Sequence, residues 1–268
     1  MEPSEYKDIL YEITNRVATI TFNRPDRMNA FTRNTYYEVT DAIRRAGWDR
    51  EVGVIVLTGA DTRAFGIGGD KDEKKADRVD SGIGILGNGV EELQTVIRDV
   101  PKPVIAKVRG YAIGSGNVLV TICDLAIAAE NAVFGQAGPR MGSVDPGFGT
   151  ALLARIVGEK KAREIWYLCR RYPAREALAM GLINAVVPDD ALDAEVDQWC
   201  AEINAKSPTA IALAKRSFNA DSENIRGIGQ LAFQALALYF GTEESKEGGN
   251  ALREKREPDF VGKMYRGR

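Results

Sequence analysis

The 268-residue sequence contains no histidine. This absence excludes Ser-His-Asp and Cys-His nucleophilic catalysis, and it removes the metal motifs that are built on histidine. Any proton transfer must therefore use carboxylates, tyrosine, lysine, cysteine or water. The sequence also has no run of 18 apolar residues and no basic, apolar leader at residues 1–7. It predicts neither a membrane span nor a secretory signal, so we expect a cytoplasmic protein without a membrane partner.

Cysteine is scarce, and the three residues Cys123, Cys169 and Cys200 are irregularly spaced. They indicate reduced core residues rather than a disulfide framework, and we predict no metal site. A net charge of −2 and a pI near 5.5 give no reason to expect a nucleic-acid partner. The remaining composition, 44% hydrophobic and 28% charged, is typical of a globular protein with one large core.

The stretch 101–130 organises the chain. It opens with the apolar run Val104–Val108, which the flanking prolines and glycine mark as a buried strand. Gly114-Ser115-Gly116 follows and leads into a segment too apolar for a surface helix. A strand, a glycine turn and a helix start leave several backbone N–H groups unpaired and parallel. Such a helix end attracts negative charge, and around a carbonyl it forms an oxyanion hole.

An earlier stretch is built in the same way. Residues 52–59 predict a strand, and residues 64–70 bring glycines that let the backbone approach a ligand closely. Taken alone, each bend could be an ordinary tight turn of an α/β domain. Neither matches the dinucleotide fingerprint or the phosphate loop.

Taken together, these motifs resemble a known family. The segments FGIGGD (65–70) and GYAIGSGN (110–117), with NRPDRMNAF (23–31), are similar to the crotonase (enoyl-CoA hydratase/isomerase) superfamily. The resemblance implies an α/β fold, a spiral of repeated ββα units over residues 1–205. A helical region over residues 206–268 would pack against neighbouring subunits in a homotrimer or homohexamer. The implied partner is an acyl-CoA substrate, with CoA part of the thioester and no separate cofactor.

The resemblance also implies site residues. The thioester oxygen would accept hydrogen bonds from the amides of Gly69 and Ser115. The family usually has glycine at the second place, and serine keeps the N–H group. The residues implied to bind CoA are Arg27, Ala64, Gly68, Asp70, Lys255 and Arg256. For the basic residues, an exposed loop or a solvated charge run is the alternative interpretation.

The loop 135–149 is too rich in glycine and proline for a helix or strand, yet apolar segments flank it. Asp145 lies in this loop, just before a helix predicted from residue 150. It could cap that helix or act on a substrate. The hydratases of the superfamily use two glutamates, at the places held here by Val118 and Gly138. A typical hydratase is therefore not expected.

Within the superfamily, the loop is most similar to the branch of 1,4-dihydroxy-2-naphthoyl-CoA synthase and 2-ketocyclohexanecarboxyl-CoA hydrolase. In that branch, the residues equivalent to Ser143 and Asp145 line the reacting end of the acyl group. The reading Ser-Val-Asp-Pro-Gly at residues 143–147 favours the hydrolase. We expect an enzyme that opens an alicyclic β-keto acyl-CoA ring with water by C–C cleavage, with Asp145 as the base and Ser143 orienting it.

Three alternatives stay open. One is the ring-closing synthase, and another is a different hydratase, lyase or thioesterase of the family. The third is a crotonase-fold protein that binds RNA or scaffolds an assembly. The branch usually carries a catalytic tyrosine at the place of Phe240, so Tyr239 would act through a shifted helix, or the chemistry runs without a phenol.

The remaining periodicity predicts the scaffold. We expect a hairpin over residues 11–22 that turns at Asn15-Arg16, and a mobile loop over the charged stretch 71–89. Apolar spacing predicts helices at 32–48, 90–100, 150–157, 160–172, 174–180, 190–205, 208–220 and 225–239.

Overall fold

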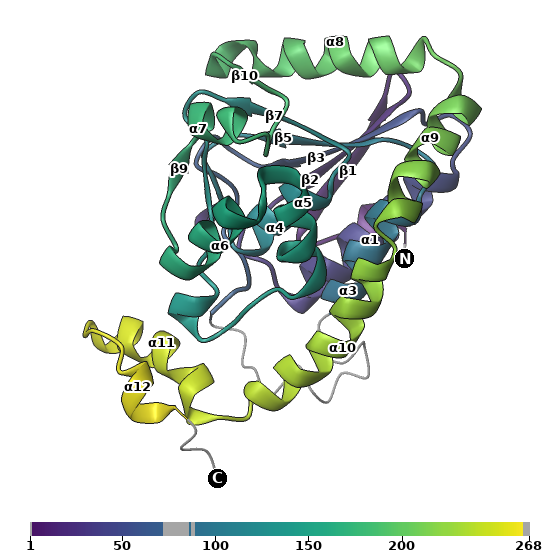
Figure 1. Cartoon of the computed structure of the whole chain (residues 1–268). Helices are drawn as coiled ribbons and strands as arrows, with labels where there is room; N and C mark the ends of the chain where they lie inside the picture. The colour runs from purple at the N-terminus through teal and green to yellow at the C-terminus, as the bar shows by residue number, and fades with distance from the viewer. Residues whose placement is uncertain (1, 72–85, 87–88, 265–268) are drawn as a thin grey trace.

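The computed structural model describes residues 2–71, 86 and 89–264. Two mixed sheets form its centre (Figure 1). The larger sheet has the order β1 (Ile9–Thr14), β2 (Val17–Phe22), β3 (Val54–Gly59), β5 (Val104–Val108), β7 (Leu125–Ala129) and β10 (Ala185–Val187). The smaller sheet has the order β4 (Ala64–Gly66), β6 (Tyr111–Ile113), β8 (Val133–Gly135) and β9 (Tyr172–Pro173). Among the described strands, the pairs β1–β2 and β8–β9 are antiparallel, and the other neighbouring strands run parallel.

Three successive strand pairs build both sheets. In β3–β4, β5–β6 and β7–β8, the first strand enters the larger sheet and the second enters the smaller one. Equivalent strands of successive pairs run parallel, so the chain winds as a spiral. The α/β spiral expected from the sequence is therefore present.

Helices cover the larger sheet on both faces. The helices are α1 (Arg33–Trp48), α3 (Val90–Asp99), α4 (Ser115–Ile122), α5 (Ala151–Val157), α6 (Glu159–Leu168), α7 (Ala174–Ala179), α8 (Leu192–Asn204), α9 (Pro208–Asp221), α10 (Asn224–Tyr239), α11 (Glu243–Glu254) and α12 (Phe260–Lys263). Helix α8 packs against one face, where Leu192 and Val196 meet Ile105 and Ile127, and the main core lies on the other. Because both faces are buried, the central strands are apolar almost throughout.

Short 3₁₀ segments connect several of these elements. They are η1 (Pro3–Glu5), η2 (Pro25–Arg27), η3 (Pro139–Met141), η4 (Gly147–Gly149) and η5 (Asp189–Ala191). Two of them, η3 and η4, lie in the loop that carries Asp145. None of the described helices has the length and apolar character needed to cross a bilayer.

Two local predictions are confirmed in detail. The hairpin turns through Asn15 and Arg16, whose φ angles of 51° and 64° suit a two-residue turn between twisted strands. Helix α1 begins after Thr32, whose hydroxyl accepts the Thr35 amide as an N-cap.

The helix predicted over 160–172 is wrong in its last turn. Helix α6 ends at Leu168 because Cys169 adopts a left-handed conformation with φ 49°. Tyr172 then pairs with Phe134 as part of β9, so strand pairing prevails over helical spacing. Most of the stretch 71–89, with its predicted mobile loop, lies outside the described residues.

The C-terminal helices leave the spiral near residue 205, between α8 and α9, and run along its side (Figure 1). Lys215 of α9 is buried, and its ammonium donates to the carbonyls of Ile97 and Lys102 and to the Asp124 carboxylate. Further along, α11 packs against η3 of the same chain. The C-terminal region is thus anchored on its own spiral.

Candidate active site

The two glycine-containing bends lie side by side. Strand β4 runs into the first bend and pairs with β6, which runs into the second. A Cβ atom built on Gly68 would lie 3.4 Å from the Ser115 nitrogen, and one on Gly114 would lie 3.6 Å from the Gly68 Cα. A Cβ on Gly116 would lie 2.1 Å from the Gly66 carbonyl oxygen. The 2.1 Å distance leaves no room for a side chain at residue 116, and Gly68 and Gly114 have positive φ angles of 90° and 58° that favour glycine. These glycines therefore bring the two predicted bends together.

The amides of Gly69 and Ser115 have no protein acceptor among the described residues. Phe31 donates to the Gly68 carbonyl and accepts from the Asp70 amide, so the Gly69 amide between them points away from Phe31. Ser115 is the first residue of α4, where an amide has no acceptor within the helix. The two amides are therefore available to an oxygen of a ligand.

Asp145 is held by two hydrogen bonds. Gln94 Nε2 of α3 donates to Oδ2 at 2.7 Å, and the Gly149 amide donates to Oδ1 at 3.1 Å. Burial raises the pKa of Asp145 to about 7, while these two hydrogen bonds oppose the rise. A carboxyl that titrates near neutrality is suited to general base catalysis. The alternative capping contact is also present, because Oδ1 accepts the Gly149 amide.

Helix α4 connects the carboxylate with the amides. The segment η4, just after Asp145, packs against α4, and so does α3, which carries Gln94. The N-terminus of this same helix supplies the Ser115 amide. The base and the donors are therefore arranged around one buried helix.

Sequence reasoning missed Gln94. It lies on α3, is buried, and comes from a position 51 residues before Asp145. A polar side chain on the apolar face of an amphipathic helix was the signal that could have found it, because buried amides need partners.

Ser143 has a different setting from the one expected. Its amide donates to the Gly138 carbonyl, and no hydrogen bond joins its side chain to Asp145 among the described residues. The contacts that orient Asp145 come from Gln94 and Gly149 instead. A catalytic role for Ser143 stays a prediction.

The loop is closed to a second carboxylate. A Cβ atom on Gly138 would lie 2.7 Å from the Ser143 carbonyl oxygen and 2.9 Å from Trp166 Cζ3. Trp166 is fixed there, since its Nε1 donates to the Gly149 carbonyl at 2.6 Å. Val118, at the other hydratase position, is buried in the core. Packing therefore agrees with the missing glutamates.

The predicted CoA-binding residues of the N-terminal half lie together. Asp70 is only 5% exposed and receives Arg24 at 2.8 Å and Arg27 at 3.2 Å. Its carboxylate therefore holds the loop that carries Arg27, and a role of either residue in CoA binding stays a prediction. Ala64 is buried, with its carbonyl accepting from Asn29, and Gly68 adopts the left-handed φ of 90° within the first bend.

The C-terminal candidates belong to a separate cluster. Burial and the nearby Glu244 raise the pKa of Tyr239. Arg256 is engaged by the buried carboxylate of Glu247, and Lys255 ends α11 in an exposed left-handed position. No hydrogen bond or ion pair within the described residues links these three candidates to the bends or to Asp145. Their roles stay predictions.

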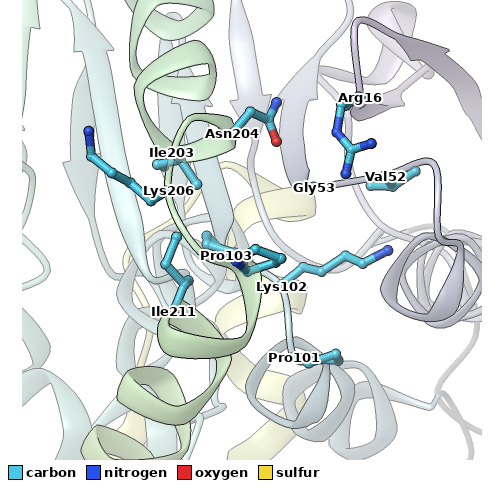
Figure 2. A pocket seen from close by; sticks show the side chains of 11 residues that line it. Arg16, Val52, Gly53, Pro101, Lys102, Pro103, Ile203, Asn204, Lys206 and Ile211 are labelled. Atoms are coloured by element: carbon cyan, nitrogen blue, oxygen red, sulfur yellow. The ribbon is translucent and has the colours of Figure 1, made fainter.

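One cavity lies elsewhere. Its volume is about 60 Å³. Figure 2 shows its lining residues, most of which come from the segment before β3, the segment before β5 and the segment that joins α8 to α9. Arg16, Lys102 and Asn204 line it, and it includes none of the predicted site residues. Within the described ranges, no group of three histidine, cysteine or carboxylate side chains could hold a metal ion.

Comparisons with known proteins show the family and the fold of the chain. A sequence model of the family described as enoyl-CoA hydratase/isomerase matches residues 12–263. An enoyl-CoA hydratase from Mycobacterium avium subsp. paratuberculosis K-10 is 31% identical; the match covers 94% of this chain and 98% of that chain, with a TM-score of 0.84. An enoyl-CoA hydratase/isomerase from Pseudoalteromonas atlantica T6c is 28% identical over 94% and 99%, with a TM-score of 0.84. An enoyl-CoA hydratase from Bacillus anthracis is 28% identical over 96% and 100%, with a TM-score of 0.74.

Proposed function

The chain belongs to the enoyl-CoA hydratase/isomerase (crotonase) family, and from this premise we propose that it opens an alicyclic β-keto acyl-CoA ring with water. The substrate would resemble 2-ketocyclohexanecarboxyl-CoA. Support for this branch comes from the residues 143–147, Ser-Val-Asp-Pro-Gly, and from the closed position at Gly138.

The observation that carries the proposal is the isolated carboxylate of Asp145. Burial raises its pKa to about 7, and the segment η4 that follows it packs against α4, the helix whose first amide is unpaired. Hydration of an enoyl double bond in this family uses two glutamates, and neither of their places holds a carboxylate here. Ring opening by water needs one base to activate the water and donors that stabilise the thioester enolate released by C–C cleavage, and the site has one carboxylate and two available amides.

The proposed reaction has four steps: attack by water, cleavage of the ring, stabilisation of the enolate and protonation of carbon. Water attacks the ring ketone and gives a proton to Asp145. The bond between the former ketone carbon and the α-carbon breaks, and its electron pair forms the thioester enolate. The amides of Gly69 and Ser115 would hold the enolate oxygen, and one such donor is typically worth about 10²–10³ in rate. Asp145 returns the proton to the α-carbon, which gives an open-chain dicarboxylic mono-CoA ester.

Product analysis tests this reaction. We expect 2-ketocyclohexanecarboxyl-CoA to gain the mass of one water with CoA retained, as measured by mass spectrometry. A saturated acyl-CoA without the ketone should remain unchanged in the same incubation. Release of free CoA would indicate a thioesterase instead. A naphthol chromophore from succinylbenzoyl-CoA would indicate the ring-closing synthase, the second candidate, which needs the same enolate stabilisation.

We also propose self-association through the C-terminal helices. Ile228, Leu231 and Leu238 lie on one face of α10, since they are three and seven residues apart. Leu231 and Leu238 are 76% and 81% exposed, and Leu213 and Phe218 of α9 are also exposed. Contiguous exposed apolar patches of this kind mark interaction sites.

The expected assembly is a trimer or hexamer of the 29.3 kDa chain. Analytical ultracentrifugation should show it for the wild type. Leu231→Glu combined with Leu238→Glu should give folded monomers, because two charges cannot be buried in an apolar contact. Leu10→Glu, at an exposed leucine of β1, is the control and should leave the assembly intact. A monomeric wild type would contradict the proposal.

A further inference from the structure

Ser115 carries a hydroxyl that the amide function does not require, because glycine would supply the same N–H group. The structure gives this hydroxyl a partner. The phenol of Tyr36 in α1 donates to Ser115 Oγ at 3.0 Å, although the two residues are 79 positions apart. Tyr36 is 4% exposed, so a buried phenol is directed at the first residue of α4.

The Tyr36 ring is held firmly in place. It packs edge-on against Phe31 with ring centroids 5.7 Å apart, and Phe31 packs against Phe22 at 4.9 Å. The backbone of Phe31 is the same backbone that pairs with Gly68 and Asp70. One segment, residues 31–36, therefore holds both bends: its backbone fixes the first, and the Tyr36 phenol fixes the second.

The Ser115 hydroxyl has a hydrogen that it can donate to a ligand. A serine hydroxyl has one hydrogen and two lone pairs. The phenol occupies a lone pair, and no group in the described part of the chain accepts the hydroxyl hydrogen. The Cα–Cβ bond of a helical residue tilts toward the helix N-terminus, which is also where the free amide points. Ser115 is partly exposed, so its hydroxyl can reach a ligand there.

We infer that Ser115 supplies two donors to the acyl oxygen, its amide and its hydroxyl, and that Tyr36 is the residue that positions the hydroxyl. The oxyanion hole then has three donors: the Gly69 amide, the Ser115 amide and the Ser115 hydroxyl. A hydroxyl that accepts a hydrogen bond is polarised and donates more strongly. The inference rests on one part of the proposed function, which is that the thioester oxygen of an acyl-CoA binds in the oxyanion hole.

The test observes the carbonyl rather than the reaction. The full-length protein is loaded with butyryl-CoA that carries ¹³C at the thioester carbonyl, and infrared difference spectra report the C=O stretch. We expect the wild type to lower the stretching frequency relative to free butyryl-CoA. Ser115→Ala and Ser115→Gly, which keep the amide, should both recover part of that shift. Tyr36→Phe should recover a smaller part.

Kinetics give a second readout. Turnover of the β-keto substrate should fall about tenfold in both Ser115 variants with KM nearly unchanged, the size of one neutral hydrogen bond. Combining Tyr36→Phe with Ser115→Ala should lower turnover no further than Ser115→Ala alone, because Tyr36 acts through Ser115. Tyr6→Phe is the matched control. It removes a phenol that donates to Asp41 at 2.7 Å, and it should change neither readout.

Two results overturn the inference: a wild-type carbonyl that is not shifted, or a shift that is the same in the wild type and in both Ser115 variants. A shift that depends on Ser115 supports it even if the β-keto ring is never opened. That combination would reject the proposed reaction and keep the three-donor hole, so the two failures are distinguishable.

Discussion

Asp145→Asn should bind acyl-CoA as the wild type does and open the β-keto ring at least about 10²-fold more slowly, because a positioned base typically contributes that much. The substitution fits the site. The new Oδ1 can keep the hydrogen bond from the Gly149 amide, and Gln94 can turn its carboxamide to accept from the new amide. Calorimetric titration would measure binding, and kcat would measure turnover.

The pH dependence of kcat/KM tests whether Asp145 is the base. Because burial raises the pKa of Asp145 to about 7, kcat/KM of the wild type should fall tenfold per pH unit below pH 7 and level off above it. Asp145→Asn should lose this inflection. Gln94→Leu removes a hydrogen bond that lowers the pKa, so its inflection should move to higher pH. If the inflection persisted in Asp145→Asn, another residue would be the base.

The unfolding free energy should also depend on the ionisation of Asp145. It should be higher at low pH, whereas kcat/KM should be lower there. The folded state favours the protonated carboxyl, so this contribution is fully present below the unfolded pKa of about 4 and is lost as the pH rises to about 7. Asp145→Asn should lack this dependence in thermal unfolding. Asp193→Asn is the control variant and should leave turnover unchanged. Asp193 lies on α8, is exposed, and pairs with Lys107 and Arg109.

Gly116→Ala should separate the two bends. Its new methyl would lie 2.1 Å from the Gly66 carbonyl oxygen, a backbone atom that cannot rotate away, so α4 must move from β4. The Ser115 amide moves with the helix. We expect turnover to fall about 10²–10³-fold, as for a lost oxyanion donor. Overpacking should also cost about 1–3 kcal/mol of unfolding free energy.

Gly249→Ala is the matched control. Gly249 lies within α11, and a methyl there would meet no atom within 4 Å. It should raise stability by about 0.5–1 kcal/mol, because alanine favours helices over glycine, and leave turnover unchanged. Full activity in Gly116→Ala would show that the close approach of the bends is not needed for catalysis.

Most of the scaffold is predictable from local patterns. The match of the family model and the solved structures confirm the crotonase fold, with two mixed sheets and a helical C-terminal region. The apolar strands β3 and β5, and the two-residue turn at Asn15 and Arg16, have signals that span only a few residues. The glycines of both bends are as informative, since a Cβ at Gly116 would lie 2.1 Å from a backbone oxygen and Gly68 and Gly114 adopt positive φ angles.

Contacts between residues far apart in the sequence could not be predicted from these local signals. The end of α6 depended on Tyr172 pairing with Phe134, which helical spacing cannot anticipate. Tyr36 and Gln94 read as ordinary residues of amphipathic helices, and their partners lie 79 and 51 positions away. A side chain on such a helix acquires its role from whatever the rest of the chain places against it.

The chain's local sequence is thus enough to specify its first hairpin, the buried strands β3 and β5, most of its long helices, its two glycine bends and a proton chemistry without histidine. These properties depend on backbone conformation and on neighbouring residues. The partners of Asp145 and Ser115, and the closed position at Gly138, arise only in the folded protein. The reason is that desolvation, hydrogen-bond geometry and close packing are set by groups that folding brings together from distant parts of the chain.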